Sequence, residues 1–192
     1  ESLRVLEELA KLPGTALDSE KFKQARFALY TVEKELLSKL LRQDKTRGLS
    51  GLYFIIDTQA LKGRCHLEVA SQAIRGGARI IQLHDKLLTR RELVPIAQEL
   101  KNLCAQENVL FIINDYLDLV LAVGADGLHL GQDDLPAEVA RKLLPMDKIL
   151  GVSVTTLDQA ASAQAAGADY ISVGALTHSA PAADISMDIE RA

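Results

Sequence analysis

The residues best suited to chemistry are acidic, lysine and hydroxyl side chains that each follow a short apolar run. Asp115 and Asp134 offer hard carboxylate oxygens of the kind that bind Mg²⁺. Lys86 provides a point charge suited to a phosphate group, and Ser153 can donate a hydrogen bond. No Cys-His pair or Ser-His-Asp nucleophile arrangement is evident in the sequence. Together these side chains indicate a small phosphorylated or pyrophosphorylated substrate held beside a metal ion.

Other polar residues follow the apolar runs in the same way. In a β/α barrel the chemistry gathers at the carboxyl ends of the strands, so these side chains are expected to share one rim. The residues at the run ends are Asp57; Gln82, His84, Asp85 and Lys86; Asn114 and Asp115; His129, Gln132, Asp133 and Asp134; Ser153, Thr155 and Thr156; and Gly174, Thr177, His178 and Ser179. The opposite ends of the runs carry mostly glycine, alanine and helix-capping residues.

Apolar runs of strand length alternate with helix-like stretches from Gly51 onward. The predicted strands are Leu52–Ile56, Arg79–Leu83, Val109–Ile113, Gly127–Leu130, Lys148–Val152 and Tyr170–Val173. The predicted helices are Arg64–Arg75, Arg90–Glu107, Tyr116–Val123, Ala137–Leu144 and Leu157–Ala166. Continuous apolar strands separated by helices are typical of a parallel sheet that is covered on its faces.

A short internal repeat favours a β/α barrel of the TIM type over an open doubly wound sheet. Gly77-Ala78, Gly124-Ala125 and Gly167-Ala168 each end a helix and begin a strand, and they recur at intervals of about two β-α units. No GxGxxG motif follows the first strand, which disfavours dinucleotide binding. Six strands are fewer than a closed eight-stranded barrel needs. The alternating residues Ile185, Met187 and Ile189 could form one short seventh strand.

The chain divides into a predicted helical N-terminal extension, residues 1–48, and a barrel domain, residues 49–192. The extension has an expected helix around Leu3 to Leu9, ending near Pro13-Gly14, and a longer one that begins at Asp18-Ser19. Apolar residues from Phe22 to Leu40 recur at intervals of three and four in the longer helix. Because two helices alone make a poor core, we expect them to pack on the barrel or on another subunit. The sequence thus leaves a homo-oligomer open.

Composition narrows the class of protein and its expected location. The 192 residues have a net charge of −4, which argues against bulk nucleic-acid binding. The apolar runs are too short to span a membrane, so no membrane partner is expected. Two cysteines, Cys65 and Cys104, are too few for a disulfide framework. A reducing, cytoplasmic setting is the default expectation.

Five stretches, in this order and spacing, resemble the thiamine-phosphate synthase family. They are Gly51-Leu52-Tyr53-Phe54-Ile55-Ile56-Asp57, Ile81-Gln82-Leu83-His84-Asp85-Lys86, Ile113-Asn114-Asp115, Ala125 to Pro136 (ADGLHLGQDDLP), and Leu150-Gly151-Val152-Ser153. The helical segment is similar, more weakly, to an N-terminal extension that some family members carry. Leu3 to Glu8 and Ala25-Arg26 carry that second resemblance.

The resemblance implies a Mg²⁺-dependent transferase. It would join hydroxymethylpyrimidine diphosphate to thiazole phosphate and release pyrophosphate, with no protein nucleophile. Asp115 and Asp134 would hold Mg²⁺ against the diphosphate, with Lys86 and Ser153 as catalytic residues stabilising the leaving group. The residues implied in substrate binding are Gln82, His84, Lys86, Asn114, Ser153 and Gly174.

Three departures from the family pattern leave alternatives open. His84 stands where the family has an arginine, and Thr155 where it has a histidine. The tail, residues 171–189, resembles the end of quinolinate phosphoribosyltransferase instead of the family's phosphate loop. The chain could therefore be an impaired synthase, a quinolinate phosphoribosyltransferase-like enzyme, or a non-catalytic protein that binds phosphate ligands. Asp115 and Asp134 could also merely cap the helices that begin near Tyr116 and Pro136.

Overall fold

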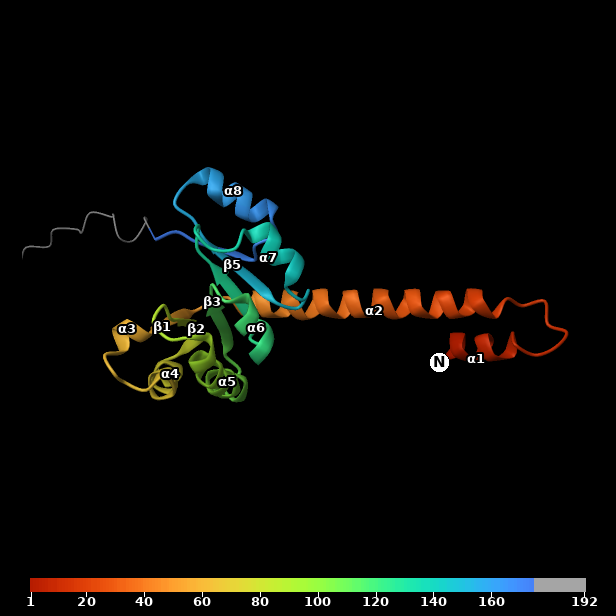
Figure 1. The fold of residues 1–192 in the computed structure, drawn as a ribbon, viewed down its shortest axis with the longest axis horizontal. Helices are drawn as coiled ribbons and strands as arrows, with labels where there is room; N and C mark the ends of the chain where they lie inside the picture. Colours follow the sequence, from red (N-terminus) through yellow and green to blue (C-terminus); the bar gives the residue numbers. More distant parts are fainter. Residues whose placement is uncertain (175–192) are drawn as a thin grey trace, which may run out of the picture.

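The computed structural model describes residues 1–174, and its centre is a parallel sheet that curls into a half-barrel (Figure 1). Its strands are β1 (Leu52–Asp57), β2 (Ala78–His84), β3 (Leu110–Asn114), β4 (Gly127–Leu130), β5 (Ile149–Ser153) and β6 (Tyr170–Ser172). The strands lie in chain order, β1-β2-β3-β4-β5-β6, and every neighbouring pair is parallel. A doubly wound sheet would reverse its strand order at a switch point, so this order confirms the predicted incomplete barrel. The predicted seventh strand lies outside the described residues.

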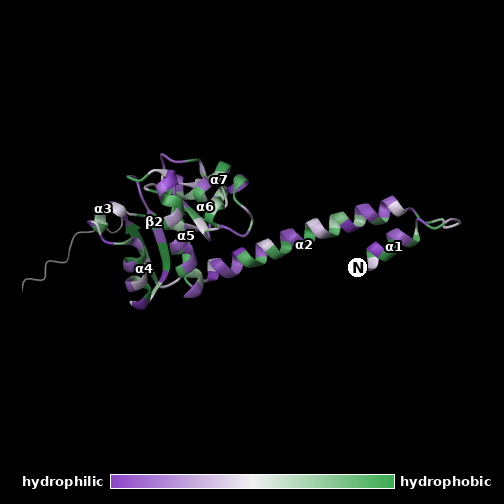
Figure 2. Cartoon of the chain, turned by 60° about the horizontal axis from the view of Figure 1, so that its bottom comes forward, coloured by the Kyte–Doolittle hydropathy of each residue, from purple (hydrophilic) through white to green (hydrophobic). Residues whose placement is uncertain are grey.

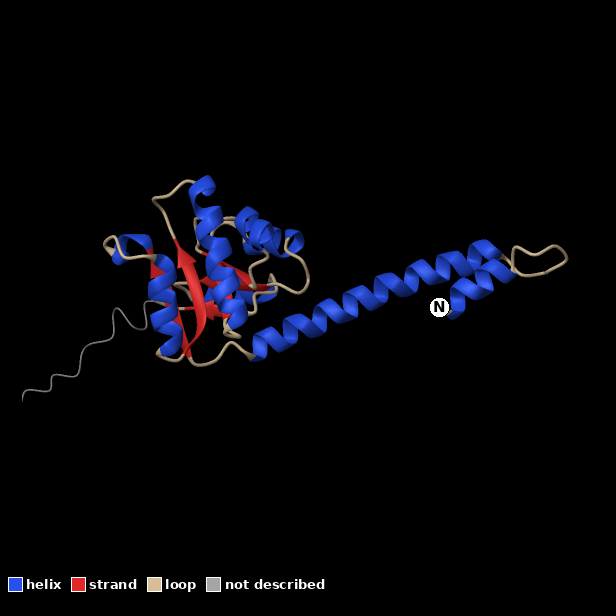
Figure 3. Cartoon of the chain, turned by 90° about the horizontal axis from the view of Figure 1, so that it is seen from below, coloured by secondary structure: helices blue, strands red, loops and turns tan. Residues whose placement is uncertain are grey.

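Helices follow the strands and cover the outer face of the sheet (Figures 1 and 3). They are α3 (Thr58–Leu61), α4 (His66–Arg75), α5 (Arg90–Gln106), α6 (Leu117–Val123), α7 (Ala137–Leu143) and α8 (Leu157–Ala165). Two of them begin with the reciprocal capping that the sequence encodes, Thr89 with Glu92 and Thr156 with Gln159. The short α3 has no counterpart among the predicted helices, because it is one turn held by the Asp57 carboxylate.

The main core lies between the sheet and these helices. Its largest fully buried side chains include Phe111 and Leu128 from the strands and Leu93 and Leu100 from α5. A smaller cluster, centred on Ile80, Ile112 and Ile149, fills the inner, concave face near the amino ends of the strands. Above it the inner face becomes polar toward the carboxyl ends. The half-barrel is therefore closed by packing at one end and open to chemistry at the other.

The N-terminal segment forms a helical hairpin that projects from the half-barrel (Figures 1 and 3). α1 (Ser2–Leu9) packs along α2 (Ser19–Arg47), and Arg26 pairs with the buried Glu7 at 2.9 Å. α2 begins where predicted, with the Asp18 carboxylate capping its first turn. α1 ends at Leu9, a few residues before the predicted end.

The apolar residues of α2 are not covered by the half-barrel. α2 has no buried residue, and hydrophobic positions recur along its projecting length (Figure 2). Leu36, for example, is 57% exposed. Of the two expected partners of these helices, the barrel contacts only the last turns of α2, and packing on another subunit stays a prediction. Within residues 1–174 no helix is both long and apolar enough to cross a membrane.

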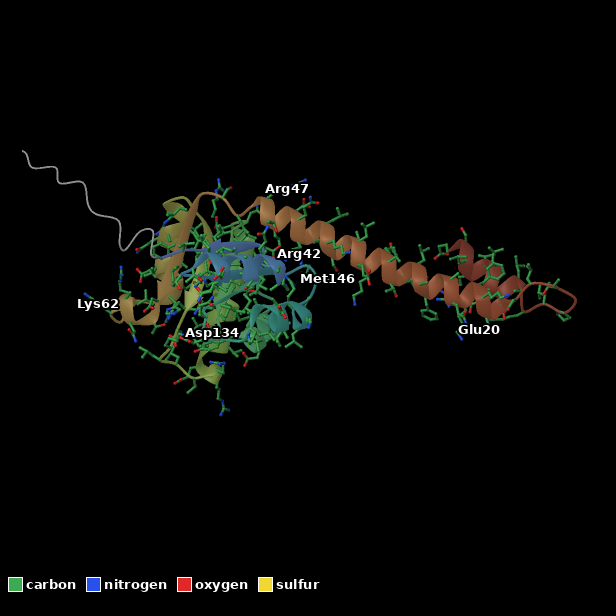
Figure 4. The ribbon with its side chains drawn as sticks, turned by 90° about the horizontal axis from the view of Figure 1, so that it is seen from above. Glu20, Arg42, Arg47, Lys62, Asp134 and Met146 are labelled. Carbon is green, nitrogen blue, oxygen red and sulfur yellow. The ribbon has the colours of Figure 1, made fainter. Side chains whose placement is uncertain are left out.

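The last turns of α2 dock on two aspartates from the internal repeat. Arg42 and Arg47 mark this end of the helix and Glu20 its far end (Figure 4). Lys45 lies 3.4 Å from Asp126, and Arg42 lies 3.6 Å from Asp169. These contacts lie at the amino ends of the strands, opposite the polar rim.

The same two aspartates explain the second and third copies of the repeat, which continue as Gly-Ala-Asp, whereas the first copy continues with Arg79. Asp126 accepts a hydrogen bond from the amide of Phe111 at 3.1 Å, and Asp169 accepts one from the amide of Leu150 at 2.8 Å. Each carboxylate therefore bonds to the neighbouring strand near that strand's amino end. The Gly-Ala-Asp pattern serves the stability of this face rather than its chemistry.

Candidate functional site

The carboxyl ends of the strands surround two adjoining cavities on the inner face of the half-barrel. The smaller, polar cavity has a volume of 280 Å³. It is lined by His84, Lys86, Asn114, Asp115, His129, Gly131, Gln132, Asp133, Asp134 and Ser153. The larger cavity, of 610 Å³, is lined by Tyr53, Ile55, Asp57, Gln82, His84, Asn114, His129, Ser153, Tyr170, Ile171 and Ser172. Four residues line both cavities, so the two form one continuous site.

Most of the predicted site residues meet in this place. Lys86, Asp115, Asp134, Asn114 and His84 line the polar cavity together with Ser153, as the rim argument predicts. Gln82 lines only the larger cavity, while Gly174 lines neither.

Asp85 belongs to the turn rather than to the rim. It is buried, and its carboxylate accepts hydrogen bonds from the amides of Leu87 and Leu88. Its role is to hold the turn that carries Lys86.

The acidic pair stands in the polar cavity on two neighbouring loops. Asp115 directly follows β3 in a left-handed backbone conformation, with φ of 61°. For a residue other than glycine this conformation costs free energy, so it marks a side chain that the fold holds in a special place. Asp134 lies in the loop after β4, where its Oδ2 accepts a hydrogen bond from the amide of Gly131 at 2.7 Å. Figure 4 shows Asp134 on the half-barrel, away from the end of α2.

Neither aspartate caps the helix that follows it, so the capping alternative is wrong. α6 has Tyr116 at its N-cap and α7 has Pro136, and neither helix has a side-chain capping hydrogen bond. Both carboxylates are therefore free of a role in starting a helix. They face the cavity instead.

The two carboxylates interact with each other and with Lys86. Burial, followed by the hydrogen bond to Asp134, raises the pKa of Asp115. Burial alone would also raise the pKa of Asp134, but the hydrogen bonds from Asp115 and Gly131 outweigh it and lower that pKa. Lys86 forms an ion pair with Asp115, and this hydrogen bond raises the lysine pKa. The arrangement concentrates negative charge that a cation would stabilise.

The oxygen donors of this pair fit a magnesium ion. Among residues 1–174 no group of three or more His, Cys, Asp or Glu side chains could hold a metal. Mg²⁺ does not require such a group, because it is often held by one or two carboxylates and completed by waters and substrate phosphates. Asp115 and Asp134 would supply the two carboxylates, and the adjacent Lys86 would remain a cation beside the phosphates.

A hydrogen-bonded network crosses the floor of the larger cavity. Tyr53 donates to Gln82 Oε1 at 2.6 Å, and Gln82 Nε2 donates to Asn114 Oδ1 at 2.8 Å. The Asn114 amide donates in turn to Asp115 Oδ1 at 2.7 Å. Gln82 is thus linked to the acidic pair although it does not line the polar cavity.

The network continues on the other side of Tyr53. The hydroxyls of Tyr53 and Tyr170 are 2.7 Å apart, and His129 Nδ1 lies 2.9 Å from the Tyr170 hydroxyl. His129 Nε2 is 2.8 Å from Ser153 Oγ, which is 2.8 Å from Ser172 Oγ. His129 fills the barrel interior, because it is buried on the inner face and stacks on Tyr170.

Burial sets the protonation of these groups. It lowers the pKa of His129 to about 4 and raises that of Tyr53 to about 12. His129 is therefore neutral at pH 7 and a weak base. Although the Ser153–His129 contact resembles a nucleophile and its base, no carboxylate of the described part of the chain hydrogen-bonds to the ring to strengthen it. The geometry favours Ser153 as a hydrogen-bonding group rather than a nucleophile.

His84 is held by Asp57 at the edge of both cavities. Its Nδ1 lies 2.6 Å from Asp57 Oδ2, and this hydrogen bond is the main cause that lowers the pKa of Asp57. The same carboxylate caps α3 through its other oxygen. His84 thus has a partner that fixes one ring nitrogen, while the ring still lines the cavity.

Tyr53, Tyr170 and Ser172 are the site residues that sequence reasoning missed. All three occupy inward positions on edge strands β1 and β6. The available signal was the alternation of side chains along a strand, since Tyr53 lies two and four residues before Ile55 and Asp57.

Comparison with known proteins matches two family models to different parts of the chain. A family model described as thiamine monophosphate synthase (TMP-TENI) matches residues 52–189, and a model of the ThiD2 family matches residues 1–35. The first match extends through the whole of the tail, residues 171–189, that resembles quinolinate phosphoribosyltransferase, so that alternative is not favoured.

Individual relatives agree with the first family match. The thiamine-phosphate synthase of Methanospirillum hungatei is 52% identical over 124 residues, which are 65% of this chain and 60% of that protein. The one from Moorella thermoacetica is 51% identical over 125 residues, with the same coverage. This chain therefore spans about 60% of the length of these curated relatives. A solved thiamine phosphate pyrophosphorylase from Pyrococcus furiosus is 36% identical with a TM-score of 0.61, covering 67% of this chain and 61% of that one.

Proposed function

The chain belongs to the thiamine monophosphate synthase family, and from that premise we propose that it joins hydroxymethylpyrimidine diphosphate to thiazole phosphate and releases pyrophosphate. The observation that carries the proposal is the meeting of Lys86, Asp115 and Asp134 in one polar cavity. Two carboxylates and a lysine are the groups that a departing diphosphate needs, namely ligands for a cation and a direct positive charge.

The residues of the site have separable roles in the proposed reaction. Asp115 and Asp134 would hold Mg²⁺, which when bound neutralises charge on the diphosphate. Lys86, whose pKa is raised by Asp115, stays protonated and can turn to the phosphate oxygens. Its side chain is half exposed, so this turn displaces little packing.

The larger cavity supports a place for the pyrimidine. Gln82 and Asn114 present amide groups beside the apolar Ile55, a surface that suits a flat polar ring. Ser153 lies where the two cavities join, between a ring in the larger cavity and a diphosphate in the smaller one. Because the described residues of neither cavity offer an activated nucleophile, the proposed reaction is a direct transfer. The bond between the methylene carbon of the pyrimidine substrate and the diphosphate oxygen breaks, pyrophosphate leaves with that electron pair, and the thiazole nitrogen bonds to the same carbon.

The test is product formation by the purified chain given both substrates and Mg²⁺. Thiamine phosphate should form, should disappear when a chelator removes the metal, and should return when Mg²⁺ is added. Asp115→Asn and Asp134→Asn should each lower kcat by about 100-fold or more, the scale of losing one group that stabilises developing charge. Asp118→Asn is the matched control, because its exposed carboxylate lies in the same segment outside the cavity and, among residues 1–174, forms an ion pair with Arg90 alone.

The outcomes distinguish an error in the assigned metal site from an absence of catalytic activity. Equal activity in Asp115→Asn and Asp118→Asn would refute the acidic pair as the metal site. A wild-type chain that makes no product, yet is stabilised against heat by pyrophosphate with Mg²⁺, would support the non-catalytic ligand-binding alternative. Self-association and a cytoplasmic location remain predictions, and sedimentation of the purified chain checks the first.

A further inference from the structure

The hydrogen bonds on the inner face all run in one direction. A carboxylate oxygen of Asp115 accepts from the Asn114 amide, so the remaining oxygen of Asn114 is an acceptor. That oxygen accepts from Gln82 Nε2, which leaves Gln82 Oε1 to accept from the Tyr53 hydroxyl. The orientation of each amide is thus fixed by the group before it, starting from Asp115.

The direction continues to the histidine. Because the Tyr53 hydroxyl gives its proton to Gln82, its oxygen must accept from the Tyr170 hydroxyl. The Tyr170 oxygen then accepts from His129 Nδ1, so the single proton of the neutral imidazole lies on Nδ1. His129 Nε2 carries a lone pair and accepts from the Ser153 hydroxyl at 2.8 Å.

We propose that Tyr53 and Tyr170 are positioning residues that fix the Nδ1-H tautomer of His129, so that Ser153 donates its proton to His129 and presents an acceptor oxygen to the substrate. With the Ser153 proton on the bond to His129, the 2.8 Å contact between the two serine hydroxyls is one in which Ser172 donates, since its own distance to His129 Nε2 is the longer 3.5 Å. Ser153 lines both cavities, so its remaining lone pair is available at their junction. A hydrogen-bond donor on the substrate meets that lone pair. The role of Ser153 toward substrate rests on the proposed function, whereas the tautomer does not.

The packing around Tyr170 and His129 holds these hydrogen bonds in one arrangement. Tyr170 is packed over Gly151, where any Cβ would overlap the tyrosine ring, and its hydroxyl lies between Tyr53 and His129. The His129 ring stacks on Tyr170, with ring centroids 5.4 Å apart. Neither ring can leave this position without breaking these partly buried hydrogen bonds.

Removal of the Tyr53 hydroxyl should reverse the relay. In Tyr53→Phe the Tyr170 hydroxyl loses its acceptor and turns to donate to His129 Nδ1. The ring proton then moves to Nε2, and His129 donates to Ser153 instead of accepting from it. Tyr30→Phe is the matched control, since it removes the same atom from exposed α2.

Nitrogen NMR of protein labelled with ¹⁵N-histidine reads the tautomer directly, and loss of a signal in His129→Gln assigns the ring. The wild-type ring should show a protonated Nδ1 and a bare Nε2, Tyr53→Phe should show the reverse, and Tyr30→Phe should match the wild type. A wild-type proton on Nε2, or a ring unchanged in Tyr53→Phe, would overturn the relay. This measurement needs no turnover, so it stands even where the chain makes no thiamine phosphate.

If the chain makes thiamine phosphate, steady-state kinetics test the role of Ser153 as a hydrogen-bond acceptor for the substrate. Tyr53→Phe should lower kcat by about 10- to 100-fold, the scale for losing a group that orients another, with a smaller change in KM. Tyr30→Phe should keep the wild-type kcat. A reversed tautomer with an unchanged kcat would refute the role of Ser153 as an acceptor.

Discussion

Replacement of Asp126 by asparagine should destabilise the half-barrel through lost charge alone. Asparagine retains an oxygen for the amide of Phe111 but removes the carboxylate that lies 2.8 Å from Lys101 and 3.4 Å from Lys45. Lys45 keeps its ion pair with Asp147, so the loss falls mainly on Lys101. Removal of one partner from a buried ion pair lowers the free energy of unfolding by about 3–5 kcal/mol. For an exposed ion pair the loss is less than about 1 kcal/mol. The Asp126 side chain is 13% exposed and both lysines are about 20% exposed. We therefore expect a loss of about 2 kcal/mol, since the lysines can turn to solvent.

Urea denaturation at pH 7 measures this loss, and a fall in melting temperature of about 4–8 °C should accompany it. Asp169→Asn is the matched control at the equivalent repeat position. Its arginine partners are more distant, at 3.5 and 3.6 Å, so it should lose only about 1 kcal/mol.

At acid pH the wild type and Asp126→Asn should have nearly the same free energy of unfolding. Although burial alone would raise the pKa of Asp126, the hydrogen bond and charge of Lys101 outweigh it, so the folded-state pKa lies below its unfolded value. A lowered carboxylate pKa adds stability above the unfolded pKa and loses it as pH falls through the folded one. The difference in free energy of unfolding should therefore reach its full value at pH 7 and decrease below about pH 4. A difference that does not change with pH, or a larger loss in Asp169→Asn, would refute the charge argument.

Two further predictions concern packing and thiol chemistry. Gly151→Ala should lose about 1–3 kcal/mol in urea denaturation, because the added Cβ overlaps the Tyr170 ring, and full stability would show that the ring is not fixed there. A thiol reagent at pH 8 should modify the exposed Cys65 quickly and Cys104 only after unfolding, because burial raises the pKa of Cys104 to about 12. Equal rates in the native protein would contradict the burial of Cys104.

The order of elements and the rim could be predicted because both depend on local pattern. Buried parallel strands are continuous apolar runs, so Leu52–Ile56 was placed within one residue of β1. The polar groups at strand ends come together for a topological reason, and Asp115 and Asp134 share a cavity although 19 residues separate them in the chain. The family resemblance added the roles that the pattern could not assign.

The rest depends on register and on long-range packing, which no local pattern encodes. Tyr53 and Tyr170 meet because β1 and β6 face each other across the curl of the sheet, not because they are neighbours in it. The spacing of apolar residues in α2 predicted a helix but not what covers it, since a stripe has the same spacing whether or not a partner is present. The one-turn α3 has too few residues to show any periodicity.

The C-terminal end of α2, which contacts the half-barrel, determines the position of the other end of the helix. A helix of 29 residues is a lever about 43 Å long, and a tilt of about 5° at one end displaces the other by about 4 Å. Arg42 and Lys45 provide the ionic anchors at the C-terminal end, so the geometry of two side chains sets where the whole hairpin points. Because salt weakens such anchors, ionic strength becomes a control on the direction of the hairpin, at the end of the half-barrel opposite the polar rim.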